Sequence, residues 1–221
     1  MKKPIFIIIV SVFVFNFVFS QQDTIIGTNK NNKYIIGLIP SKANNIFGLA
    51  VGPLGSEVIC NKPYTQFSYG LNLQIPGQGF MQTFYINQQL FKKIYKTNKS
   101  EDVLIHNDTA NKRVVHNGLI ISAFGTFTDQ INGISVSAWM SLGKKMNGVS
   151  INLLWNLYTR MNGVSIGMTN YSVDTKGVQI GLINKTVKLK GIQIGLWNKN
   201  EKNTLPIINW NLGKNKKASE N

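Results

Sequence analysis

A short glycine-led peptide recurs at nearly constant intervals in the second half of the chain, and it limits the fold more than any other feature. The first of these glycines is followed by others 15, 15, 15, 14 and 14 residues apart. A fixed period of this kind indicates one structural unit laid beside copies of itself. The copies begin at Gly118, Gly133, Gly148, Gly163, Gly177 and Gly191.

The unit that starts at Gly177 has the two-residue alternation of a β-strand. Residues 178–183 alternate, with Val178, Ile180 and Leu182 on one side and Gln179 on the other. This pattern is typical of a strand with one buried face, so we expect Val178, Ile180 and Leu182 in the core and Gln179 in solvent.

A turn and a second, shorter strand complete the unit. Asn184 and Lys185 supply turn chemistry, because asparagine tolerates left-handed backbone. Residues 187–190 then alternate again, with Lys188 and Lys190 expected to point outward. Asparagines occupy the same slot in successive units at 170, 184 and 198, and Asn156 is displaced by one residue in a longer copy.

The repeat predicts an all-β fold, a short-repeat β-solenoid-like array preceded by an irregular β-rich region. In a solenoid each repeat is one coil, and like residues stack about 4.8 Å apart. The alternative is an antiparallel β-meander or small β-barrel with one short hairpin per repeat. A signal that returns every repeat favours the coil, although a core enclosed by 14 residues is small.

The chain divides into five predicted segments. They are a signal peptide at 1–20, a polar lead-in at 21–33, an irregular β-rich region at 34–116, the β-repeat array at 117–211, and a basic disordered tail at 212–221. Within the irregular region, Gly48 and Gly70 begin peptides that look like decayed copies of the repeat.

The N-terminus predicts export. Lys2 and Lys3 precede an apolar run over residues 5–19, and cleavage before Gln21 fits the small-residue rule of signal peptidases. The alternative is an uncleaved anchor, for which the run is short. We expect a location at the cell surface or outer membrane, or alternatively an extracellular or periplasmic one. The single cysteine, Cys60, excludes an intramolecular disulfide.

Candidates for catalysis or metal binding are few. His106 and His116 flank a polar segment with Asp102 and Asp108, but their spacing matches no metal-ligand signature. The serines of the repeats lack a nucleophile elbow, and no glycine-rich phosphate loop opens a helix. We expect no catalytic residues, no metal and no cofactor. The competing hypothesis is an exported enzyme with its site within 34–116.

Basic residues recur on the turns and second strands of the repeats. The chain carries a net charge of +15, and in a stacked array these side chains would form a basic stripe. Such a stripe attracts anionic envelope lipid or polysaccharide, although a solvated face that prevents edge-to-edge aggregation is the simpler interpretation. The aromatics are not in step with the lysines, so we expect no specific nucleic-acid partner. The predicted stripe comprises Lys144, Lys145, Arg160, Lys176, Lys185, Lys188 and Lys190.

The repeated units resemble those of bacterial surface repeat-containing proteins. The resemblance covers residues 118–210 and rests on iterated G-[VI]-[QS]-I-G-L-x-N units, seen most clearly at Gly163, Gly177 and Gly191. It implies an exported cell-surface protein and supplies no catalytic residues.

Together these features predict an exported, non-catalytic cell-surface β-repeat protein with a structural or adhesive role. The alternative is a small outer-membrane β-barrel that forms a pore or anchors an envelope complex. Four tryptophans are available for an interfacial girdle in that alternative, but the alternating runs are shorter than the strands of such barrels.

Overall fold

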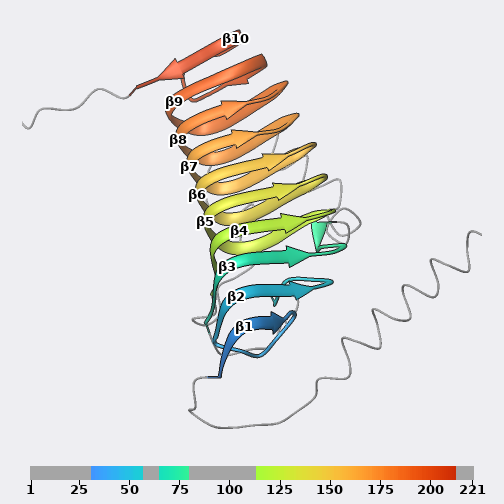
Figure 1. Cartoon of the computed structure of the whole chain (residues 1–221). Helices are drawn as coiled ribbons and strands as arrows, with labels where there is room; N and C mark the ends of the chain where they lie inside the picture. Colours follow the sequence, from blue (N-terminus) through green and yellow to red (C-terminus); the bar gives the residue numbers. More distant parts are fainter. Residues whose placement is uncertain (1–30, 57–64, 80–112, 213–221) are drawn as a thin grey trace, which may run out of the picture.

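The fold is a single β-sheet wound into a stack of coils. A computed structural model describes residues 31–56, 65–79 and 113–212, and these residues form ten strands paired in chain order (Figure 1). The strands are β1 (Asn32–Leu38), β2 (Asn45–Gly52), β3 (Gln66–Gln74), β4 (Val114–Ser122), β5 (Gly125–Ser137), β6 (Met140–Asn152), β7 (Trp155–Ile166), β8 (Thr169–Ile180), β9 (Ile183–Lys199) and β10 (Thr204–Asn211).

Neighbouring strands from β1 to β9 pair in parallel, with each repeat laid on its predecessor in register. Gly148 faces Gly163, Gly163 faces Gly177, and Gly177 faces Gly191. One coil per repeat is therefore the observed architecture, and the solenoid prediction is confirmed. The alternative of an antiparallel meander or small barrel is wrong, because the pairing is parallel and the sheet order starts at β1 and ends at β10.

Each long strand bends at its repeat glycine, which divides the coil into two arms. The glycines of this column have positive φ, for example 129° at Gly163 and 135° at Gly177. Residues with a Cβ rarely adopt this conformation, so the sequence places glycine where the chain must turn. We call the residues before the glycine the pre-glycine arm and those after it the post-glycine arm.

The same stack extends into the first half of the chain. Gly48 pairs with Gly70 and Gly70 with Gly118, so the two decayed copies of the repeat are true members of the glycine column. Strand β4 crosses the position between residues 116 and 117, where we drew the start of the array. The leader, Cys60, His106 and the C-terminal tail beyond Leu212 lie outside the described residues.

The buried and exposed sides of the post-glycine arm are reversed relative to the sequence expectation. Gln179 is 1% exposed, whereas Ile180 and Leu182 are 37% and 46% exposed. The expected core positions Val178, Ile180 and Leu182 are therefore wrong, with Val178 only half-buried. Their alternation was predicted correctly, but its polar side faces the other arm.

Hydroxyl and amide side chains occupy this inner side because they bond to one another inside the narrow coil. Gln193 Nε2 donates to Gln179 Oε1 at 2.7 Å, and Gln179 Nε2 donates to Ser172 Oγ at 3.1 Å. In the middle coils the Tyr158 hydroxyl lies 2.6 Å from Ser141 Oγ and 2.8 Å from Ser150 Oγ. A buried polar group costs little when it is hydrogen-bonded in this way.

Apolar packing comes mainly from inward residues of the pre-glycine arm. Met146 and Met161 are 0% and 1% exposed and pack with Ile131, Ile120 and the ring of Tyr158. In β9, Leu189 is buried while Lys188 and Lys190 are exposed, as the sequence predicted.

An asparagine ladder lies near the other junction of the arms, where the post-glycine arm of one coil turns into the pre-glycine arm of the next. Each Nδ2 donates to the next Oδ1 at 2.8 Å, from Asn156 to Asn170, Asn184 and Asn198 in turn. Asn156 is thus in register with Asn170, so its displacement by one residue along the sequence does not displace it in the stack. The extra residue of the longer unit is taken up in the turn between Ile151 and Trp155.

Candidate functional site

The two outward positions of the post-glycine arm form the most continuous surface feature of the solenoid. They build two ladders, one residue from each strand, and both ladders are apolar over all ten strands. We call these ladders the apolar face. The first comprises Ile36, Leu49, Leu71, Leu119, Ile134, Val149, Val164, Val178, Ile192 and Trp210; the second comprises Leu38, Val51, Leu73, Ile121, Val136, Ile151, Ile166, Ile180, Ile194 and Ile208.

Side chains of the apolar face are open to solvent. Ile134 is 45% exposed, Ile151 40% and Ile194 41%. An open groove runs across four coils of the second ladder, and its lining continues onto Leu153, Met168 and Leu182 at the following turn. Contiguous exposed apolar surfaces are often functional, so the apolar face is the candidate site of this chain.

A second ladder system lies immediately before the glycines, at the corner where the two arms meet. We call it the corner column, and it changes chemistry along the stack. Rings come first: Tyr34 stacks on Phe47 with centroids 5.3 Å apart, and Phe47 stacks on Tyr69 at 5.1 Å. The column then continues as Asn117, Asn132, Asn147, Asn162, Lys176 and Lys190.

Amides of the corner column also bond along the stack, in the opposite direction to those of the asparagine ladder. Asn132, Asn147 and Asn162 each donate from Nδ2 to the preceding Oδ1, at 2.7, 2.6 and 2.8 Å. Sequence reasoning missed this column. The signal was the recurring Asn-Gly pair, which is usually a hairpin turn but here precedes a bend between parallel coils.

The predicted basic stripe is divided among separate columns. Lys145, Arg160 and Lys188 share one column of the pre-glycine arm, which Asp174 interrupts. Lys176 and Lys190 belong instead to the corner column and are exposed.

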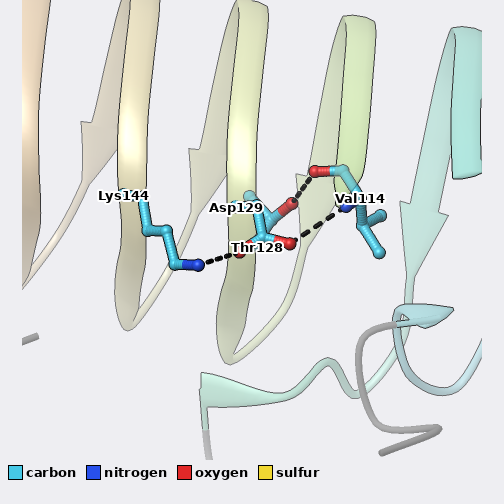
Figure 2. A network of polar contacts seen from close by, with 4 residues as sticks. All are labelled: Val114, Thr128, Asp129 and Lys144. Carbon is cyan, nitrogen blue, oxygen red and sulfur yellow. Dashed lines mark hydrogen bonds and ion pairs between the residues drawn. The ribbon is translucent and has the colours of Figure 1, made fainter. Parts of the chain in front are cut away.

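Lys144 takes part in a local network of polar contacts in the pre-glycine arm of its coil. Its Nζ lies 3.1 Å from Asp129 Oδ1, and the backbone N–H of Val114 donates to Asp129 Oδ2 at 3.0 Å (Figure 2). Thr128 Oγ1 donates to the carbonyl of Val114 at 3.4 Å. These bonds tie three consecutive coils together, so Lys144 has a structural role in this network.

Lys185 is also separated from the exposed lysines. It is 9% exposed, and its Nζ lies 5.7 Å from the centroid of the Tyr171 ring. Burial, together with the charge of Lys199, lowers the pKa of Lys185 below its ordinary value. The structure thus brings Lys176 and Lys190 together in the corner column. Lys145, Arg160 and Lys188 lie in the column two residues earlier on the same outward side, and Lys144 and Lys185 lie apart from both columns.

His116 lies in a hydrogen-bonded interior site. It is 3% exposed, and its Nδ1 is 2.5 Å from Ser68 Oγ and 3.0 Å from Asn72 Nδ2. Its predicted partners His106, Asp102 and Asp108 lie outside the described residues. Within 31–56, 65–79 and 113–212 there is no cluster of three side chains suited to a metal ion.

The serines of the repeat are buried in the coils. Ser135 and Ser150 are 0% exposed and Ser165 is 1% exposed. In this part of the chain no helix has the length and apolarity needed to span a bilayer. Comparison of the chain with protein-family models, curated proteins and solved structures finds no match.

Proposed function

We propose that this chain is an exported, non-catalytic repeat protein of the cell surface or outer membrane, whose solenoid presents a binding surface. The observation that carries the proposal is the apolar face, which runs unbroken along ten strands and is not covered by the opposite arm. A scaffold that uses its hydroxyls and amides internally and presents a regular apolar surface is suited to adhesion or envelope structure.

The arrangement of the polar side chains supports a non-catalytic role. Ser68 and His116 form a pair, but both are buried among their own partners. A nucleophile and base need access to a substrate as well as mutual contact. Two of the repeat serines bond within the interior in the same way, Ser135 with Ser141 and Ser150 with Tyr158.

Export is supported by the N-terminal sequence, with its basic start, apolar run and small-residue site before Gln21. The resemblance to bacterial surface repeat-containing proteins points in the same direction. The one cysteine in 221 residues fits a protein that relies on sheet pairing and not on disulfides.

Fractionation tests the proposal directly. In a bacterium with an outer membrane, we expect the chain in the surface or outer-membrane fraction, with an N-terminus at Gln21, and sensitive to protease added to intact cells. Ile8→Arg, which places a charge in the apolar run, is the control and should hold the chain in the cytosol. Wild-type protein found in the cytosol with Met1 or Lys2 at its N-terminus would contradict export.

A further inference from the structure

We propose that the apolar face, together with Lys176 and Lys190 of the corner column, docks the solenoid on an anionic lipid bilayer. The inference rests on the binding role proposed above and names the partner. In this arrangement the two apolar ladders enter the headgroup region, and the two lysines meet lipid phosphates at the edge of the contact.

The apolar face is long and narrow. Ten strands about 4.8 Å apart give a stripe about 43 Å long, and two outward positions with the turn residues beyond them make it about 14 Å wide. Binding at a bilayer interface scales with the apolar area inserted plus attraction to anionic headgroups. The stripe supplies the first contribution without a transmembrane segment.

Charge supplies the second contribution. The chain carries 24 Lys and Arg against 9 Asp and Glu. The apolar face contains no acidic residue, and among the described residues of the corner column both charged members are lysines. A lysine held near an anionic leaflet contributes about 1 kcal/mol to binding.

Aromatic side chains at both ends of the stack add to this preference. Trp210 pairs with Ile192 and continues the first ladder with 59% of its surface exposed, and Tyr34 at the other end is 66% exposed. Tryptophan and tyrosine favour the bilayer–water interface, where the ring is buried and the polar atom stays hydrated.

A second copy of the chain fits the same surface less well. In a two-fold contact a second copy presents the same patch, and that patch contains no acidic side chain to pair with Lys176 and Lys190. The stripe covers about 600 Å², less than the roughly 800 Å² per partner of a stable protein interface. A bilayer has neither restriction.

Vesicle binding by three variant pairs tests the inference. The protein is purified from the cells that make it, and its N-terminus is determined. It is then sedimented with vesicles of phosphatidylcholine alone or with vesicles in which about a third of the lipid is anionic phosphatidylglycerol. We expect stronger binding to the anionic vesicles and weaker binding at about 0.5 M salt, because salt screens the lysines.

The variants separate the surface from the overall charge. Lys176→Gln with Lys190→Gln should weaken binding at least about tenfold, whereas Lys145→Gln with Lys188→Gln removes the same charge from another column and should weaken it less than about threefold. Ile180→Ser with Ile194→Ser should weaken binding about tenfold or more without loss of folding, because both side chains are exposed.

Three outcomes would overturn the inference. They are absence of binding to anionic vesicles, equal losses for the two lysine pairs, and a solution dimer that the Ile180 and Ile194 changes abolish, which would assign the face to a second copy. If the protein is exported but does not bind vesicles, the bilayer inference is contradicted and the proposed function is not. A protein kept in the cytosol with its leader contradicts the proposed function whatever its vesicle binding.

Discussion

Single residues of the glycine column carry the bend of every coil. At Gly163, φ is 129°, and a Cβ built there would overlap the carbonyl oxygen of Gly148 in the preceding coil. Neither the backbone angle nor the close approach tolerates a side chain, and neighbouring coils fix both.

We therefore expect Gly163→Ala to lower the free energy of unfolding by about 3 kcal/mol. The cost combines an unfavourable backbone angle with overpacking against the neighbouring coil. Urea denaturation followed by circular dichroism measures it. A loss below about 1 kcal/mol would show that the bend does not depend on this glycine.

Ile35 provides the opposite test within the same column. It stands opposite Gly48 in the first coil with φ of 73°, a conformation that is strained for a β-branched residue, and its side chain is 79% exposed. Ile35→Gly removes the strain and little buried surface, so it should raise the free energy of unfolding by about 1 kcal/mol. A decrease in the free energy of unfolding by the same amount, in the same urea denaturation measurement, would contradict the assignment of backbone strain to Ile35.

Tyr158 makes the stability of the stack sensitive to high pH. Burial raises the pKa of Tyr158 above its ordinary value of 10.0, so the unfolded chain loses this proton at a lower pH than the folded chain. The folded state therefore binds more protons, and stability falls as pH rises through the unfolded value near 10.

The variant Tyr158→Phe should cost about 1–2 kcal/mol at pH 7, because Ser141 and Ser150 lose a hydrogen-bond partner. The difference from wild type should shrink between pH 9 and 11, since phenylalanine cannot ionise. Urea midpoints at several pH values test this. A constant difference across that range would mean that Tyr158 does not contribute to the alkaline loss.

At the scale of the element, two amide ladders join neighbouring coils, one inside the stack and one at the corner. Asn170 is 1% exposed and bonds to Asn156, Asn184 and the carbonyl of Ile180. Asn162 is half-buried and bonds to Asn147. The same side chain thus serves in two environments that differ in access to water.

We expect Asn170→Ala to cost about 3 kcal/mol and Asn162→Ala about 1 kcal/mol. The inner substitution leaves buried partners unsatisfied, whereas water replaces the lost bond at the corner. Thermal and urea unfolding of the two variants, side by side, test the difference. Equal losses would mean that water reaches both ladders.

At the scale of the whole molecule, the end of the stack needs a cap. Strand β10 runs antiparallel to β9, and Asn209 continues the column of Gln179 and Gln193 by donating to Gln193 Oε1 at 3.3 Å. Pro206 and a register shift between Leu205 and Ile207 interrupt the pairing of β10. Prolines and bulges of this kind protect a sheet edge from pairing with another molecule.

Removal of residues 204–221 should therefore expose the edge of β9 and cause concentration-dependent association. Repeat arrays depend on terminal caps for solubility, because an open coil end can pair with another stack. Sedimentation velocity over a tenfold concentration range detects the oligomers. Removal of residues 213–221 alone is the control, since it leaves β10 in place, and a monomeric truncation at 203 would contradict the capping role.

Much of this architecture was predictable from residues alone. The glycine spacing and the recurrence of asparagine at 170, 184 and 198 predicted coils stacked in register, and the structure confirms both. A strict period requires equivalent neighbours, and parallel stacking of one coil on the next provides them. The outward lysines at 188 and 190 followed from the same alternation.

The tertiary structure alone decided which side of the post-glycine arm is buried. Alternation at residues 178–182 shows that the two faces of a strand differ, but it does not show which face meets the other arm. In a coil of 14 residues the space beside the bend is filled by Gln179 and Gln193, which bond to each other across neighbouring coils. Each of these glutamines has a hydrogen-bond partner in a neighbouring coil, and Ile180 and Ile194 therefore point outward. The sequence of a single repeat does not contain such partners, so it does not predict which side of the arm is exposed.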